Sequence, residues 1–144
     1  MDFESIFSLI VPALIATIIH TFLGMAWFGP IFGRQWMKFM EFNKLSASEK
    51  KTAEKQMPKL YMGQVVVTFL ANIILGLFLV NLYTANPYFV GFMLWLGFVF
   101  TSQSTATIWS QTKAKYVPSQ IVIATLYQLV SIMIAVALFS LMSL

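Results

Sequence analysis

The sequence predicts an all-α integral membrane protein: a four-helix bundle with a cytoplasmic amphipathic interfacial helix after the first span. Of the 144 residues, 59% are hydrophobic and only 10% are charged, whereas a soluble domain is nearer half apolar and a quarter charged. The apolar residues also fall into four continuous runs, each of about the 20 residues that a helix needs to cross a bilayer. The chain length predicts a single transmembrane domain, residues 1–144.

The four predicted spans cover approximately residues 6–28, 60–82, 88–109 and 120–142, and none contains Asp, Glu, Lys or Arg. Helices are expected because the runs do not alternate, and because only helices and closed barrels satisfy their backbone polar groups in lipid. The N-terminus is acidic and lacks the basic region of a secretory signal, so we expect the first span to be retained.

The connections between the spans predict the orientation. All nine Lys and Arg residues lie in the first connection, residues 29–59, or in the third, residues 110–119. Four helices place these two connections on the same side of the membrane. Short loops rich in Lys and Arg stay in the cytoplasm, so we expect both termini on the non-cytoplasmic side.

Three further local patterns occur in the connections. Aromatic and apolar residues recur at helical spacing from Ile31 to Phe42, which predicts an amphipathic helix in the headgroup region, with Trp27, Phe32 and Trp36 as interfacial anchors. The segment 46–49 fits a capping box that opens a second, polar helix, which Pro58 is expected to end. In the short second connection, Asn86 followed by Pro87 is typical of a helix N-cap.

The first span ends in a distinctive block, residues 24–38, with the sequence GMAWFGPIFGRQWMK. Gly29 and Pro30 are predicted to end the span there, since the residue before a proline is disfavoured in a helix. Through its WFGP-x-FG-x-x-WM pattern, the chain resembles a family of small four-span membrane proteins catalogued as domain of unknown function number 1761. The resemblance implies the four-span architecture and, with the small size, a bacterial inner membrane. It implies no activity.

Uncharged polar residues inside the spans are the candidate functional residues. Counted at about 1.5 Å per residue from the cytoplasmic ends, several fall in the same cytoplasmic half of the bilayer: His20, Gln64, Thr68, Gln103, Thr125 and Gln128. Asn72 shares a helix face with Gln64 and Thr68. The candidate residues for a polar cavity are His20, Gln64, Thr68, Asn72, Gln103 and Gln128. Buried amides and hydroxyls need hydrogen-bond partners, so we expect these groups to face one another. They form either contacts between helices or a polar cavity open to the cytoplasm.

Two functions remain open from the sequence. The first is a structural or accessory membrane protein, acting as a homo-oligomer or beside a larger membrane partner. The alternative is a small oligomeric transporter or channel for a neutral or anionic solute. We expect no enzyme activity, cofactor or metal site, because the chain has no cysteine, one histidine and no catalytic motif. The lipid bilayer is the expected partner, and nucleic acid is not, because the basic residues flank the spans.

Overall fold

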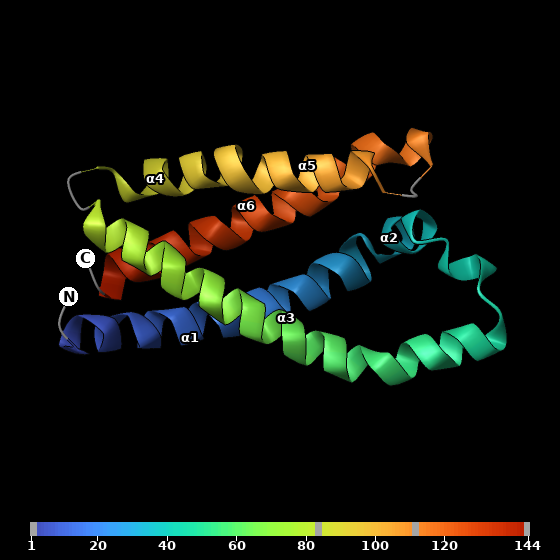
Figure 1. Ribbon diagram of the computed structural model, residues 1–144, viewed down its shortest axis with the longest axis horizontal. Coiled ribbons are helices and arrows are strands. Elements are labelled where there is room, and N and C mark those ends of the chain that lie inside the picture. Colours follow the sequence, from blue (N-terminus) through green and yellow to red (C-terminus); the bar gives the residue numbers. More distant parts are fainter. Residues whose placement is uncertain (1–2, 83–84, 111–112, 143–144) are drawn as a thin grey trace.

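The computed structural model describes residues 3–82, 85–110 and 113–142, and within these ranges the chain is helical with no strand (Figure 1). Four helices are long and apolar enough to cross a membrane: Ser8–Ile31, Ala47–Asn81, Pro87–Ile108 and Ala114–Met142. Each overlaps one of the predicted spans. The all-α class and the four apolar helices are therefore confirmed.

The first apolar helix consists of α1 (Phe3–Ala26) and a wider π-helical segment, η1 (Trp27–Ile31). The second is α3 (Ala47–Asn81), and the fourth consists of the 3-10 turn η4 (Ala114–Tyr116) and α6 (Val117–Met142). The third is divided into α4 (Pro87–Leu94), the π-helix η3 (Trp95–Phe100) and α5 (Thr101–Ile108). Figure 1 shows both chain ends at one end of the bundle, the terminus end, and the short helix α2 (Gly33–Phe39) at the opposite, loop end.

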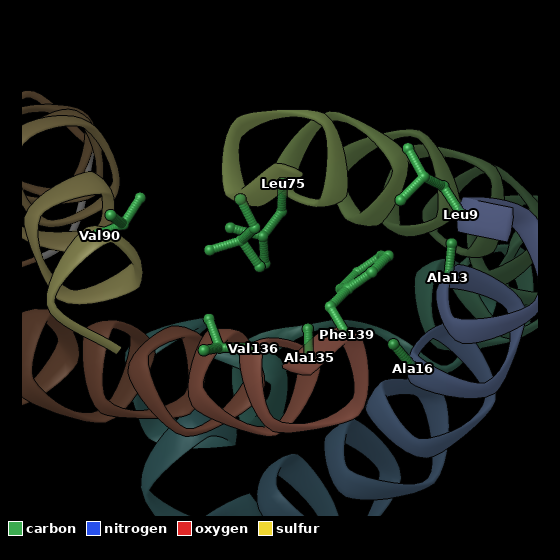
Figure 2. Close-up of a cluster of buried hydrophobic side chains, with 9 residues drawn as sticks. Leu9, Ala13, Ala16, Leu75, Val90, Ala135, Val136 and Phe139 are labelled. Carbon is green, nitrogen blue, oxygen red and sulfur yellow. The ribbon is translucent and has the colours of Figure 1, made fainter. Parts of the chain in front are cut away.

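The hydrophobic core lies nearer the terminus end, where α1, α3, α4 and α6 meet (Figure 2). Its buried members are Leu9, Ala13, Ala16, Leu75, Leu79, Val90, Ala135, Val136 and Phe139. Alanines on α1 and α6 allow these helices to approach closely, as small residues do between membrane helices. The ring of Phe139 is completely buried among them.

The predicted end of the first span at Gly29 and Pro30 is wrong. The helix continues through Pro30 as a π-helix, in which the Phe32 N–H donates to the Trp27 carbonyl oxygen at 2.8 Å. This longer hydrogen bond spans the proline, which has no N–H of its own. The chain turns instead at Phe32, and α2 begins at Gly33, where a Cβ would lie 2.9 Å from the Phe28 carbonyl oxygen.

The helix expected from Ile31 to Phe42 is shorter in the structure. It is α2, Gly33–Phe39, followed by a 3-10 turn, η2 (Phe42–Lys44). Glu41 adopts the left-handed conformation with φ of 51°, which cannot continue a right-handed helix. Phe39 is buried, whereas Met40 is 61% exposed, so these two side chains do not share the expected face.

Pro58 does not end the polar helix, which is a second correction. The structure has one continuous α3 of 35 residues, with Pro58 in its interior. The neighbouring residues are mostly good helix formers and are exposed, so water can bond the carbonyl that lacks a donor. The predicted capping box is present: the Glu49 N–H donates to Ser46 Oγ at 3.3 Å, and the Ser46 N–H donates to Glu49 Oε2 at 2.7 Å.

The N-cap expected at Asn86 is also present. Its side-chain oxygen accepts hydrogen bonds from the N–H groups of Tyr88 at 2.9 Å and Phe89 at 3.3 Å. Pro87 occupies the first turn of α4, where its missing N–H costs nothing. This cap fixes where the third apolar helix begins at the terminus end.

Candidate functional site

A groove of about 390 Å³ lies between α3 and the third apolar helix, with residues of α1 and α6 at its base. α3 and the third apolar helix diverge toward the loop end (Figure 1). The polar residues that line the groove are His20, Gln64, Thr68, Asn72, Gln128 and Ser131. The apolar lining comes from Val67, Ala71, Ile74, Leu75, Phe78, Leu94, Phe98, Val99 and Ile132.

Five of the six residues predicted from the sequence line this groove. Gln103 does not; it lies half-buried on α5. The groove is open at the surface of the bundle, because Val67 on α3 is 61% exposed and Phe98 on η3 is 71% exposed. Its base is closed, since His20, Asn72 and Ser131 are each at most 5% exposed.

The His20 ring joins α1 to α6 at the base of the groove. Its Nε2 lies 2.7 Å from the Ser131 carbonyl oxygen. A carbonyl oxygen only accepts hydrogen bonds, so Nε2 carries the hydrogen and Nδ1 is left as an acceptor. Asn72 Nδ2 lies 3.5 Å from this Nδ1. The contacts therefore specify a neutral imidazole in one tautomer.

Asn72 connects α3 to the same network. Its Nδ2 donates to Thr17 Oγ1 at 3.1 Å, and Thr17 Oγ1 in turn donates to the Ala13 carbonyl oxygen at 2.7 Å. Each donor in this series of hydrogen bonds therefore points toward α1 or along it. Together with His20, the network ties three helices to one another at a fixed register.

The polar groups near the base of the groove also contact one another along α6. Ser131 Oγ is buried and lies against the Tyr127 side chain, one turn earlier on the same helix. The Tyr127 hydroxyl, on the same helix, donates to the His20 carbonyl oxygen at 3.1 Å. Nearer the loop end, exposed Gln64 donates from Nε2 to Thr68 Oγ1 at 3.1 Å. Ser131 was not in the predicted set of cavity residues, although it lies three residues beyond Gln128 and so on the same face of α6.

Two tryptophans hold the neighbouring helices to α6. Trp27 Nε1 donates to the Ile123 carbonyl oxygen at 3.1 Å, and Trp95 Nε1 donates to the Thr125 carbonyl oxygen at 2.9 Å. The second bond starts at the first residue of the π-helix η3 and fixes this helix beside the groove. Trp95 is only 9% exposed, so its indole ring packs between helices.

The three residues expected to anchor the protein in the interface lie in an aromatic cluster at the loop end. The Trp27 and Phe32 ring centroids are 5.1 Å apart, and those of Phe28 and Trp36 are 4.6 Å apart. Phe28 also contacts Tyr127 of α6, with centroids 5.1 Å apart. These rings hold α2 against the bundle, and their contact with lipid stays a prediction.

One carboxylate connects the first and third connections. Glu41 Oε1 lies 2.8 Å from Lys113 Nζ, and Glu41 Oε2 lies 3.0 Å from Lys44 Nζ. The hydrogen bonds from Lys113 and then Lys44 lower the pKa of the Glu41 carboxyl, and Glu41 raises the pKa of Lys113. All three side chains are well exposed, so salt screens this contact.

The groove offers hydrogen-bonding groups on a mostly apolar surface and no Asp, Glu, Lys or Arg. Among the residues that the structure describes, no three His or acidic side chains come together as a metal site. The polar side chains that line the groove can therefore hydrogen-bond to a polar, uncharged group.

The family model described as protein of unknown function (DUF1761) matches residues 11–140. The chain belongs to this family. The match confirms the resemblance inferred from the sequence, and every residue that lines the groove of this DUF1761 protein lies within the matched region. No curated protein and no solved structure matches the chain.

Proposed function

We propose that this DUF1761 protein crosses a bacterial inner membrane four times, with both termini outside the cytoplasm, and binds a small molecule in its groove in the manner of a small transporter. The orientation is supported by the distribution of charge. The nine basic residues all lie in the first and third connections, which retains these connections in the cytoplasm. The loop end of Figure 1 is then cytoplasmic.

The observation that carries the binding function is the buried polar base of an open groove. The volume of about 390 Å³ falls within the range of small-molecule pockets, roughly 300–1,000 Å³, which are typically apolar with a few polar groups. Polar side chains in the bilayer region cost free energy unless they are bonded. The side chains of Gln64, Thr68 and Gln128 line the groove, and a bound molecule would supply hydrogen bonds to them.

Contacts between helices account for only part of the polar set. The bonds from His20 to Ser131 and from Asn72 to Thr17 fix the helix register, as the structural interpretation expects. Gln64, Thr68 and Gln128 line open space instead. The network at the base therefore supports a rigid wall, and the remaining residues are available to a ligand.

A structural or accessory role is the second candidate. It is supported by Gly97, where an added Cβ would meet nothing within 4 Å, so another helix can approach closely there. Exposed Thr101 follows one turn later, but its hydroxyl donates to the Gly97 carbonyl oxygen at 2.7 Å. This hydroxyl needs no partner helix to satisfy it in lipid, which is why we place the groove first.

Cysteine accessibility tests the proposal, because the chain has no native cysteine. Single cysteines at Gln64, Thr68 and Gln128 are treated with a membrane-impermeant maleimide in inverted vesicles. Leu126, exposed on α6 outside the groove, is the lipid-facing control, and Gln103 tests the neighbouring face of α5. We expect labelling at the groove positions and protection at Leu126.

Protection at all three groove positions in folded protein would contradict the small-molecule groove. A disulfide between two copies carrying Gly97→Cys, formed in the same membranes, would then favour the accessory role as a homo-oligomer. If no such disulfide forms, a larger membrane partner is the remaining form of that role.

A further inference from the structure

We propose that the loop end carries a binding site for a negatively charged phosphate group, formed where α2, η2 and the third connection meet. The site is separate from the groove and does not depend on the proposed function. Three observations carry the inference: a hollow between these segments, an excess of positive charge around the hollow, and its position at the end of the fourth apolar helix.

The hollow has a volume of about 150 Å³. A water molecule occupies about 30 Å³ of the liquid, so the hollow has room for about five waters or for one tetrahedral phosphate group. The residues that line it come from the first and third connections and are Met37, Lys38, Glu41, Asn43, Lys44, Lys113 and Tyr116.

The charges around the hollow favour an anion. Three lysines and one glutamate line it, so two positive charges are left uncompensated. Glu41 contacts Lys113 at 2.8 Å and Lys44 at 3.0 Å, but each ammonium group has three donors, and the remaining donors are available. Lys38 forms no ion pair with any acidic residue that the structure describes. A phosphate monoester carries a charge of about −1.5 to −2 at pH 7, which matches this excess.

The walls of the hollow are held in place without an anion. Glu41 adopts the left-handed conformation, which is uncommon outside glycine and asparagine, and the Lys44 N–H donates to the Glu41 carbonyl oxygen at 2.8 Å. This turn returns the chain toward Glu41 directly after α2. On the opposite side, the ring of buried Phe39 packs against Tyr116, with centroids 5.6 Å apart. Binding a phosphate group therefore requires little rearrangement.

The position of the hollow favours a lipid head group as the source of the phosphate. Tyr116 belongs to η4, where the fourth apolar helix (Ala114–Met142) begins. The hollow therefore lies near the level at which that helix enters the bilayer, where lysines attract anionic lipids. A soluble phosphate monoester offers the same chemistry, so the test includes both sources.

The test uses the full-length protein in detergent micelles and a phosphatidic acid with a fluorophore on one acyl chain as the probe. Lys38→Gln and Lys113→Gln should each weaken binding about two- to fivefold, as expected for one exposed ionic contact, and Lys113→Arg should retain it. Lys51→Gln and Lys55→Gln are the matched controls, because they remove the same charge from an exposed part of α3 outside the hollow. Equal weakening in both pairs would show an effect of net charge alone and would overturn the proposal.

Competition identifies the source of the phosphate and tests the need for negative charge. Displacement of the probe by unlabelled phosphatidic acid but not by glycerol 3-phosphate would support the site with a lipid as its ligand. Displacement by glycerol 3-phosphate at a similar concentration would support the site with a soluble phosphate monoester. Phosphatidylcholine with the same acyl chains has no net charge and should not compete. If phosphatidylcholine displaces the probe as well as phosphatidic acid does, the acyl chains determine binding and the proposal is wrong.

Discussion

The ring of Phe139 on α6 lies so close over Gly76 on α3 that a Cβ at residue 76 would be 2.5 Å from the Phe139 Cε1 atom. Phe139 is completely buried, and its neighbours in the core occupy the space to which it would have to move (Figure 2). The hydrogen atom of a glycine is therefore what allows α3 and α6 to pack at this point.

Replacing Gly76 with alanine should destabilise the bundle. Forcing an extra methyl group into a packed core typically costs about 1–3 kcal/mol, and we expect a loss of that size in the free energy of unfolding, measured by denaturant titration in detergent micelles. Gly63→Ala is the matched control, since it lies on the same helix with nothing within 4 Å of its Cβ position. A Gly76→Ala variant as stable as Gly63→Ala would contradict the packing described.

The hydrogen bond of Trp95 provides a second prediction. Trp95→Phe removes the Nε1 donor to the Thr125 carbonyl oxygen, a buried bond of 2.9 Å. Polar contacts between membrane helices are worth about 0.6–2 kcal/mol, so a loss in this range is expected in the same titration. Trp109→Phe serves as control because Trp109 is 85% exposed. Equal stability of the two variants would show that the Trp95 bond contributes nothing.

The contact of Glu41 with Lys113 should depend on pH and salt. The pKa of the Glu41 carboxyl is lowered below the ordinary value of 4.5, chiefly by the Lys113 hydrogen bond. The contact is therefore complete above that value and is lost as the pH falls through the lowered pKa. Spin labels on cysteines at Asn43 and Ala114 should show a broader distance distribution at low pH or high salt.

Two variants control this measurement. Glu41→Gln should give the broad distribution at every pH, and Glu54→Gln, on the exposed part of α3, should behave like the parent protein. A distance distribution that is unchanged from neutral to strongly acidic pH would mean that the carboxylate does not hold the two connections together.

Membrane orientation can be tested at the C-terminus. A reporter enzyme that is active only outside the cytoplasm, fused after Leu144, should be active if the positive connections are retained inside. If a reporter that is active only in the cytoplasm is active at the same position, the orientation is the opposite of the one proposed. The fold would stand in that case, but the loop end would face the outside.

The apolar helices were predictable because hydropathy over about 20 residues depends only on local composition. The caps at Ser46 and Asn86 were predictable for the same reason, since each motif acts within four residues. The predictions that helices end at Pro30 and at Pro58 failed because each assumed that a proline must end a helix. At Pro30 a π-helical hydrogen bond spans the proline, and at Pro58 the exposed flanking residues favour a continuous helix.

Placement of the candidate site was partly predictable. Depth along each helix placed His20, Gln64 and Gln128 in the same half of the bilayer, because rise per residue is nearly constant. Helical spacing placed Asn72 on the same face of α3 as Gln64. Depth does not specify which face of its helix a residue occupies. Gln103 lies in the predicted half of the bilayer but does not line the groove. It follows the π-helix η3, whose wider turns change the facing of every later residue relative to a regular α-helix. No local pattern in the sequence predicted the π-helix η3.

Helix α3 is unbroken for 35 residues, or about 52 Å at 1.5 Å per residue, whereas a bilayer core is only about 30 Å thick. Its first turns therefore extend beyond the length needed to cross the core. The lysines of these turns lie on the same continuous helix as Gln64, Thr68 and Asn72 of the groove, and Pro58, which lacks a backbone donor, lies between them.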